Sequence, residues 1–404
     1  MTTLSTEPAT AFERLRRTYA AVAVMALNAV VLFVAINLLA AVYFSVKERV
    51  RPSNFIVPFT QGYGISIDSL AAMYPGLSNR DIGDLLQETW TDDPPLVYEP
   101  FTLFKERPRA GKYIKVDAAG FRVSRNQGPW PPDRSQYRTV FVFGGSTTFG
   151  YGVRDEDTVV SHLQPLLDTE PGSRPVRLYN FGRGYYFLSV ERILFQQLLS
   201  AGFVPDAAVF IDGLNDFAYA SGEPAGADRF RKAVEGGSSS RTNLEAIVQR
   251  LPATTLARHG MEKLGFRRHD DPDDEASSGI TETARGKAIQ GVIRRYVDDK
   301  KMIETLATPY GVATSFVWQP VPTYKQDLRY YLFSKGGFGL HALSGAGYPV
   351  MAKVAPRDPN FIWCADIQVG LSEPLYVDKV HYSPSMSRHL AQCIADGMKK
   401  SEQP

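Results

Sequence analysis

A serine that follows two glycines is the first candidate for chemistry in this sequence. Residues 144–152 read Gly-Gly-Ser-Thr-Thr-Phe-Gly-Tyr-Gly and come directly after the apolar run 139–143. Glycines permit a tight turn and let a ligand approach the backbone, and a helix that follows points its N–H groups towards an anion. A phosphate-binding P-loop is excluded, because no Gly-Lys-Ser/Thr follows at the required spacing. The segment therefore favours Ser146 as a nucleophile.

A carboxylate and a histidine three residues apart form the second candidate. The segment 378–382 reads Asp-Lys-Val-His-Tyr and shortly precedes the last expected helix. Asp378 at this spacing can accept a hydrogen bond from Nδ1 of His381, which leaves Nε2 to take a proton from a serine. His162 and His341 have no such partner at that spacing. We therefore expect His381 to be the base and Asp378 to orient it.

Two further polar segments each follow an expected strand. Residues 180–186 read Asn-Phe-Gly-Arg-Gly-Tyr-Tyr, and residues 212–216 read Asp-Gly-Leu-Asn-Asp. The backbone near Gly184 and the side chain of Asn215 could each offer an N–H group, and convergent N–H donors stabilise a tetrahedral oxyanion. Glycine and asparagine are also ordinary turn residues, so neither segment is specific alone.

Strands and helices alternate along the part of the chain that carries these segments. Apolar, β-branched runs predict buried parallel strands at 139–143, 176–180, 207–211 and 313–318. Helical patterns lie between and after them, at about 158–167, 188–200, 287–307 and 385–398. This alternation predicts an α/β fold whose parallel sheet is covered on both faces. All four candidate segments then lie at or near the carboxyl ends of strands, where such sheets bind ligands.

The N-terminal part carries a long uncharged segment. No charged residue occurs from Thr18 to Val46, and about 20 apolar residues suffice to cross a bilayer. A cleaved signal peptide would have a shorter apolar core and a small-residue cleavage site. We therefore expect a cytoplasmic tail (1–17) and one transmembrane anchor (18–46). The flanking arginines and lysines are nearly balanced, so the short tail, rather than charge, favours a cytoplasmic N-terminus.

The rest of the chain is expected to be less regular. Residues 47–137 are rich in proline, glycine and aromatics and predict a stem and an irregular extension packed on the main domain at 138–404. Insertions are expected at about 221–285 and 325–360. The acidic run 270–275 in the first is typical of a solvated loop, and the Tyr- and Gly-rich second insertion could form a lid. The two cysteines, Cys364 and Cys393, could form a disulfide or remain two buried thiols.

Composition excludes some classes of function. The 404 residues carry a formal net charge of +2, and nucleic-acid binding needs a concentrated basic face. With 44% apolar residues the chain can build a sizeable core. No CxxC pair is present, so a structural zinc site is not expected. We expect no metal, no cofactor and no nucleic-acid partner.

Taken in chain order, the four segments resemble the conserved blocks of the SGNH (GDSL-type) hydrolases. They match a serine block, a glycine block, a GxND block and a C-terminal DxxH block, over residues 138–400. The serine block reads Gly-Gly-Ser where the family has Gly-Asp-Ser. An alternative alignment of the glycine block puts Tyr185, rather than Gly184, at the family's glycine. The resemblance implies a three-layer α/β/α, flavodoxin-like SGNH hydrolase fold.

The resemblance also implies roles for individual residues. Ser146, His381 and Asp378 become the catalytic triad, and the N–H groups of Ser146, Gly184 and Asn215 form the oxyanion hole. A backbone N–H works equally from Tyr185, so the second donor is Gly184 or Tyr185. Residues in or beside these segments are candidates for binding substrate: Thr147, Tyr185, Asp216 and Gln319.

The implied reaction is acyl transfer from an ester through an acyl-enzyme. Together with the anchor, it predicts a single-pass inner-membrane esterase that faces the periplasm or exterior and acts on an acylated carbohydrate or lipid of the cell envelope. Two alternatives stay open. A sugar hydroxyl could replace water, which would make the protein an O-acyltransferase acting on an extracellular polysaccharide. A non-catalytic binding module is the other, although such a module would be expected to lose its serine or histidine.

Overall fold

The computed structural model describes residues 11–49, 55–90, 96–168, 174–227, 231, 251–254, 256–257, 281–334, 337–355 and 357–401. The chain divides into two units, which are Met1–Pro52 with Phe230–Asp270, and Ser53–Arg229 with Asp271–Pro404. Most of the expected insertion at 221–285 lies outside the described residues.

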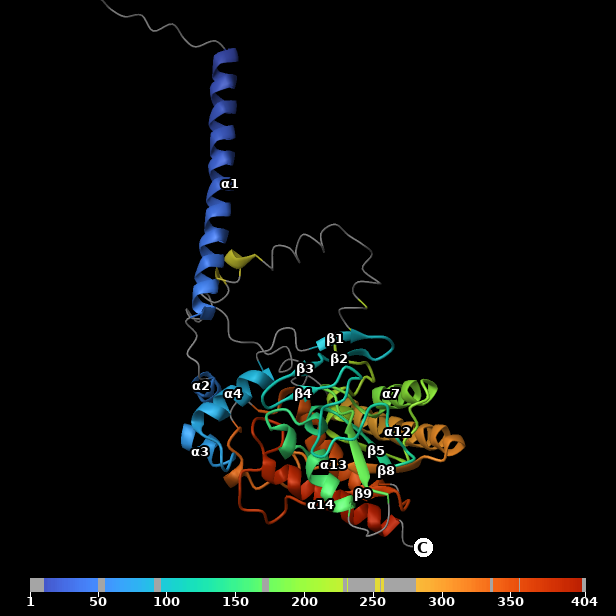
Figure 1. The fold of residues 1–404 in the computed structure, drawn as a ribbon. Helices are drawn as coiled ribbons and strands as arrows, with labels where there is room; N and C mark the ends of the chain where they lie inside the picture. The colour runs from blue at the N-terminus through green and yellow to red at the C-terminus, as the bar shows by residue number, and fades with distance from the viewer. Residues whose placement is uncertain are drawn as a thin grey trace, which may run out of the picture. The chain divides into compact units, whose positions relative to one another are not determined.

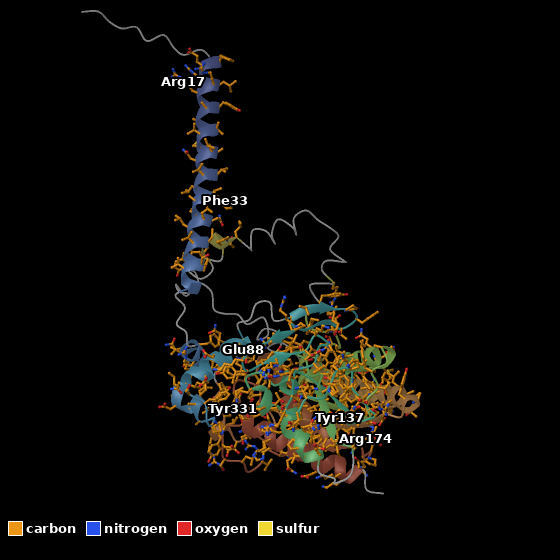
Figure 2. The ribbon with its side chains drawn as sticks, viewed as in Figure 1. Arg17, Phe33, Glu88, Tyr137, Arg174 and Tyr331 are labelled. Atoms are coloured by element: carbon orange, nitrogen blue, oxygen red, sulfur yellow. A yellow bond between two sulfur atoms is a disulfide. The ribbon has the colours of Figure 1, made fainter. Side chains whose placement is uncertain are left out.

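The first unit contains one long helix, α1 (Ala11–Arg49). Its segment Ala11–Val46 is long and apolar enough to cross a membrane, and it has the position of a signal sequence as well. Side chains such as Arg17 and Phe33 project outward around the helix (Figure 2), and Phe33 is 53% exposed. An isolated helix with apolar side chains on all faces is stable in lipid rather than in water.

The second unit is built on a five-stranded parallel sheet (Figure 1). The strands are β5 (Arg138–Gly144), β6 (Val176–Asn180), β7 (Ala207–Asp212), β8 (Ala313–Trp318) and β9 (Phe361–Trp363). Their order across the sheet is β6-β5-β7-β8-β9, and neighbours pair in parallel. Counted along the sheet this is 2-1-3-4-5, the flavodoxin-like order. The predicted α/β class is therefore confirmed.

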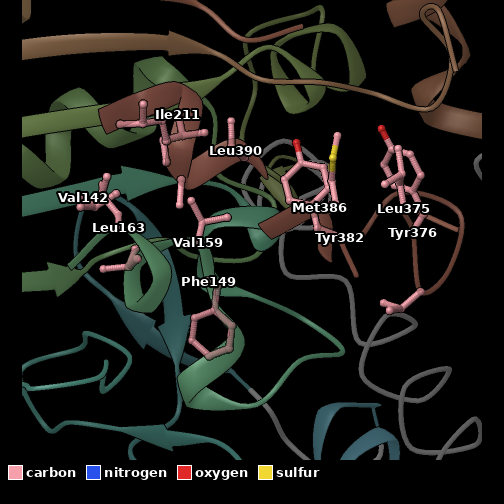
Figure 3. Packing of buried hydrophobic residues seen from close by; sticks show 14 of the residues in the cluster. Val142, Phe149, Val159, Leu163, Ile211, Leu375, Tyr376, Tyr382, Met386 and Leu390 are labelled. Atoms are coloured by element: carbon pink, nitrogen blue, oxygen red, sulfur yellow. The ribbon is translucent and has the colours of Figure 1, made fainter. Parts of the chain in front are cut away.

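Alternate residues of the strands enter two separate cores. Val140 and Val142 of β5 belong to one core, which includes side chains of α6 (Val159–Leu167) and α14 (Pro384–Ser401). Figure 3 shows part of this core, with Val142 and Ile211 from the strands beside Leu163 and Leu390 from the two helices.

The opposite face of the sheet forms the second core. Phe141 and Phe143 pack there with side chains of α7 (Leu188–Ser200), α12 (Glu282–Ala307) and α13 (Ala342–Val354). Side chains of a strand point alternately to its two faces, so the near-continuous apolar runs fill both cores. The result is the expected three-layer α/β/α arrangement.

The structure is more helical than expected outside this framework. Residues 47–137 contain α2 (Ile56–Tyr63), α3 (Ile67–Ala71) and α4 (Asn79–Trp90), followed by two short antiparallel pairs. These pairs are β1 (Leu96–Glu99) with β2 (Leu103–Glu106), and β3 (Arg109–Ala110) with β4 (Lys115–Val116). The second expected insertion, 325–360, contains α13, and the three-residue strand β9 was not predicted.

Cys364 and Cys393 form a disulfide. It joins the residue after β9 to α14, and the 29-residue separation encloses Asp378 and His381. This settles the alternative left open by the sequence. Disulfides persist in oxidising compartments, so the bond points to a location outside the cytoplasm.

Removing the disulfide should lower the free energy of unfolding by about 3–4 kcal/mol, because a closed loop of this length restricts the unfolded chain. The measurement is chemical denaturation of the C364A/C393A double variant beside the oxidised protein. The unsubstituted protein, reduced before unfolding, is the matched control and should lose a similar amount. A difference below about 1 kcal/mol would contradict the expectation.

Candidate active site

The turn after β5 presents Ser146 at the carboxyl edge of the sheet. Gly144 has φ +154°, and a Cβ atom built there would lie 2.1 Å from Thr148 Oγ1. A Cβ atom on Gly145 would lie 2.5 Å from Nδ2 of Asn215. Ser146 is partly exposed, whereas Thr147 and Thr148 are buried. The two glycines are therefore required sterically, and Asn215 lies against the turn that carries the candidate nucleophile.

Asn215 is held with its amide facing this turn. It lies in the short helix α8 (Leu214–Ala218), which follows β7 and Gly213 with φ +120°. Its Nδ2 atom donates a hydrogen bond to the carbonyl oxygen of Tyr186 at 2.8 Å. An amide nitrogen carries two hydrogens, so the second is available for an oxyanion.

The glycine segment departs from the expected pattern. The N–H of Gly184 donates to Oε1 of Glu106 at 2.6 Å, so this predicted donor is already occupied. Tyr185 has φ +66°, a left-handed conformation that favours glycine and is uncommon for a bulky residue. These two observations favour the alternative in which the N–H of Tyr185 is the second donor.

Asp378 and His381 form the expected pair. Nδ1 of His381 lies 2.7 Å from Oδ2 of Asp378, whose Oδ1 accepts the N–H groups of Val380 at 2.9 Å and His381 at 2.8 Å. Burial acts to raise the pKa of Asp378, but the charge and hydrogen bonds of His381 outweigh it, so the pKa is lowered. Asp378 is therefore ionised at neutral pH and can hold the Nδ1–H tautomer.

Aromatic rings connect the base to the turn of Ser146. The ring of Tyr151 stacks on His381 with centroids 5.3 Å apart, and Trp90 contacts His381 at 5.2 Å. The N–H of Tyr151 donates to the carbonyl oxygen of Ser146 at 3.1 Å. His381 Nε2 is buried and has no hydrogen-bond partner among the described residues. The Asp–His pair of the expected triad is therefore formed, whereas no hydrogen bond joins Ser146 to Nε2 of His381.

Three of the four candidate substrate-binding residues are buried and engaged within the protein. Thr147 Oγ1 donates to Oε1 of Gln319 at 2.7 Å, and the hydroxyl of Tyr382 donates to the same oxygen at 2.7 Å. Oδ2 of Asp216 accepts the N–H of Gly213 at 2.9 Å. Thr147 and Gln319 thus tie the Ser146 turn to the residue after His381. Tyr185, by contrast, is 48% exposed, and its ring contacts that of Phe104 with centroids 6.0 Å apart.

Residues that sequence reasoning missed lie around these groups. Glu106, from β2, also accepts a hydrogen bond from the hydroxyl of Tyr151 at 3.1 Å, and burial raises its pKa. Glu106 and Trp90 come from the N-terminal extension, where no local motif marks them. Tyr151 lies inside the glycine-rich segment of Ser146 and could have been noted from its position. No group of three or more metal-binding side chains occurs in the described ranges.

Asn215→Ala should lower kcat for ester cleavage about 10²–10³-fold, because one preformed oxyanion donor is typically worth that much. The measurement is steady-state kinetics of p-nitrophenyl acetate hydrolysis. Asn79→Ala, at an exposed asparagine that starts α4, is the control and should retain full activity. A decrease in kcat of less than threefold in Asn215→Ala would contradict the assignment of Asn215 as an oxyanion donor.

A buried carboxyl beside the site gives a second prediction. Glu191 of α7 is fully buried, and burial together with the charge of Asp216 raises its pKa well above the usual value. The folded protein then binds more protons than the unfolded chain above about pH 4. Its free energy of unfolding should fall as the pH rises, by up to about 1.4 kcal/mol per pH unit for this proton.

In Glu191→Gln the free energy of unfolding should fall less steeply as the pH rises. Unfolding experiments between about pH 5 and pH 8 measure this slope. Asp212 also has a raised pKa, through burial and the charges of Glu191 and Asp216, so some slope should remain. Parallel pH curves for the two proteins would show that Glu191 is ionised in the fold.

Three comparisons with known proteins were informative to different degrees. No protein-family model matches the chain, and no curated protein matches it. Among solved structures it is similar to a G-D-S-L family protein from Desulfitobacterium hafniense DCB-2, at 9% identity and a TM-score of 0.35. That match covers 64% of this chain and 99% of the other.

Two acetylxylan esterases are similar to the same extent. One matches at 16% identity and a TM-score of 0.32, over 63% of this chain and 97% of the esterase. A catalytic mutant of the esterase Axe2 from Geobacillus stearothermophilus matches at 12% identity and a TM-score of 0.34, over 66% and 94%. The fold itself is established by the strand order and the layers described above, and the case for activity rests on the residues of the candidate site.

Proposed function

We propose that this protein is a membrane-anchored serine esterase of the SGNH type. The observation that carries the proposal is the pairing of Asp378 with His381 at 2.7 Å, beside the turn that presents Ser146 and the amide of Asn215. An ionised carboxylate on Nδ1 is the arrangement that prepares Nε2 to act as a general base.

The proposed reaction proceeds through an acyl-enzyme. Ser146 Oγ attacks the ester carbonyl carbon while Nε2 of His381 takes the hydroxyl proton. The oxyanion is held by N–H groups of Ser146, Asn215 and Tyr185. The C–O bond to the alcohol then breaks, and His381 gives its proton to the leaving oxygen. Water, deprotonated by His381, attacks the acyl-enzyme and releases the acid and Ser146.

The proposed setting is the outer face of a bacterial inner membrane. The apolar segment of α1 can anchor the chain, and the disulfide fits an oxidising compartment such as the periplasm. The proposed substrate is an O-acyl ester, such as an O-acetyl ester, on a carbohydrate or lipid of the cell envelope. An O-acyltransferase uses the same groups with a sugar hydroxyl in place of water and is the second candidate.

The test is turnover of p-nitrophenyl acetate by the full chain in detergent, together with labelling by diethyl p-nitrophenyl phosphate. We expect release of p-nitrophenol and a single phosphoryl adduct on the peptide that contains Ser146. A protein that shows neither turnover nor an adduct on Ser146, while its unfolding transition is intact, would support a non-catalytic binding module instead.

A further inference from the structure

A pocket of about 340 Å³ lies against the base rather than against the nucleophile. Its walls come from α2, the end of α4, the segment 338–341 and the loop 378–381. Ser146, Tyr185 and Asn215 do not line it. Most of its side chains therefore belong to the N-terminal extension and the second insertion, outside the five-stranded framework.

The position of the pocket indicates which part of an ester it would hold. In acyl transfer the oxyanion donors surround the carbonyl oxygen, whereas the base serves the alcohol oxygen. His381 protonates the alcohol that leaves and deprotonates the hydroxyl that enters. A pocket that includes His381 but none of the proposed oxyanion donors therefore lies on the alcohol side of the reacting carbon.

Three residues of this pocket carry a buried nitrogen without a hydrogen-bond partner among the described residues. They are Nε1 of Trp90, Nδ1 of His341 and Nε2 of His381. Each nitrogen is shielded from solvent, and a buried polar atom left unpaired is costly. An occupant with several hydroxyl groups would recover that cost once the rings turn enough for the hydroxyls to reach the nitrogens. An aliphatic chain would leave all three nitrogens unpaired.

The remaining walls are mainly aromatic. Phe59 and Tyr63 of α2 lie with ring centroids 5.0 Å apart, and Phe338 completes this side of the pocket. Flat rings pack well against the C–H faces of a sugar ring, while the polar groups hold its hydroxyls. A volume near the lower end of the usual range for ligand pockets, about 300–1,000 Å³, suits a small sugar unit.

We propose that this pocket binds the alcohol part of the substrate as a pyranose ring, with His341 and Trp90 holding its hydroxyl groups. The assignment to the alcohol side rests on the proposed function, whereas binding of the ring does not. Burial lowers the pKa of His341 to about 4, and the charge of His381 adds to this. His341 is then neutral at pH 7, with one nitrogen that donates and one that accepts.

The first experiment measures binding without catalysis. Full-length Ser146→Ala protein in detergent is titrated with methyl pyranosides of glucose, galactose and mannose and with cyclohexanol, by ligand-observed NMR. We expect at least one pyranoside to bind more tightly than cyclohexanol. Adding His341→Ala to that protein should weaken binding of the pyranoside about tenfold. This factor corresponds to about 1.4 kcal/mol, the contribution of one hydrogen bond.

The matched control for this titration is His389→Ala in the same background. His389 pairs with Glu373 at 3.3 Å and does not line this pocket, so binding should be unchanged. The proposal is overturned if no pyranoside binds, if cyclohexanol binds as tightly as every pyranoside, or if His341→Ala binds equally well.

The second experiment measures how the acyl-enzyme divides between water and a sugar. Protein with Ser146 intact is acylated by p-nitrophenyl acetate in the presence of the tightest pyranoside, and mass spectrometry gives the ratio of acetylated sugar to acetate. This ratio is set after p-nitrophenol has left. His341→Ala should lower it about tenfold, and His389→Ala should not.

The two proposals fail in different ways in this design. An absence of Ser146-dependent p-nitrophenol release counts against the esterase, even if the pyranoside binds in the first experiment. Normal release with the same ratio in His341→Ala and the unsubstituted protein counts against the sugar pocket alone. A large ratio would also favour the O-acyltransferase over the esterase.

Discussion

Ser146→Ala is expected to reduce kcat for p-nitrophenyl acetate at least about 10⁴-fold. The alanine removes the oxygen that attacks the ester, so only the oxyanion donors and substrate binding remain, and in a serine protease those leave a small part of the rate enhancement. Ser146 is partly exposed at the start of a short helix, so the substitution should leave the fold intact.

Steady-state kinetics and thermal unfolding on the same preparation test this expectation. Ser200→Ala, at an exposed position that ends α7, is the matched control and should retain full activity. If Ser146→Ala kept more than a tenth of the activity, the ester would be cleaved elsewhere, and the assignment of Ser146 as the nucleophile would be wrong.

Asp378→Asn is expected to lower kcat about 10⁴-fold. A loss of this size is seen when the triad of a serine protease loses its carboxylate. The amide of an asparagine can donate to Nδ1 of His381, which would move the ring proton to Nε2. The ring could then no longer accept the proton of Ser146. A residual activity above a tenth would show that another group sets the tautomer.

The same variant should show a characteristic dependence of stability on pH. Because the pKa of Asp378 is lowered in the fold, its ionised form stabilises the protein above the unfolded pKa of about 3.9, and this contribution is lost as the pH falls through the folded pKa. The difference in unfolding free energy between the two proteins should therefore shrink below about pH 4.

Urea unfolding at a series of pH values measures that difference. Asp366→Asn is the control, because Asp366 pairs with Lys325 at the surface at 2.9 Å, and surface pairs contribute less than about 1 kcal/mol. A gap between Asp378→Asn and the unsubstituted protein that stayed constant down to pH 2 would contradict the lowered pKa.

The regular part of the fold could be predicted because its signals are local. The β-branched and aromatic runs at 139–143 and 207–211 are too apolar for a strand with a solvated face, so they indicated a sheet covered on both sides. The structure confirms these strands and the helices between them. Strand β9 was missed because three residues hold too little periodicity to separate a strand from a loop.

The pairing of Asp378 with His381 could also be predicted, since the two residues lie three apart and their contact depends on one short loop. The cysteine pairing could not, because Cys364 and Cys393 meet only after β9 and α14 have packed. The same reason explains the hydrogen bond from Gly184 to Glu106, which joins residues 78 positions apart. No pattern near either residue marks the other.

The sequence by itself therefore determined the α/β framework, the long apolar helix and the types of residue available for acyl transfer. Tertiary structure alone decided which of them meet. It directed the Gly184 N–H to Glu106, buried Thr147, Asp216 and Gln319 among the protein's own hydrogen bonds, and placed Trp90 and His341 beside His381. Periodicity and short motifs record local conformation, whereas contacts between distant segments depend on the packing of the whole unit.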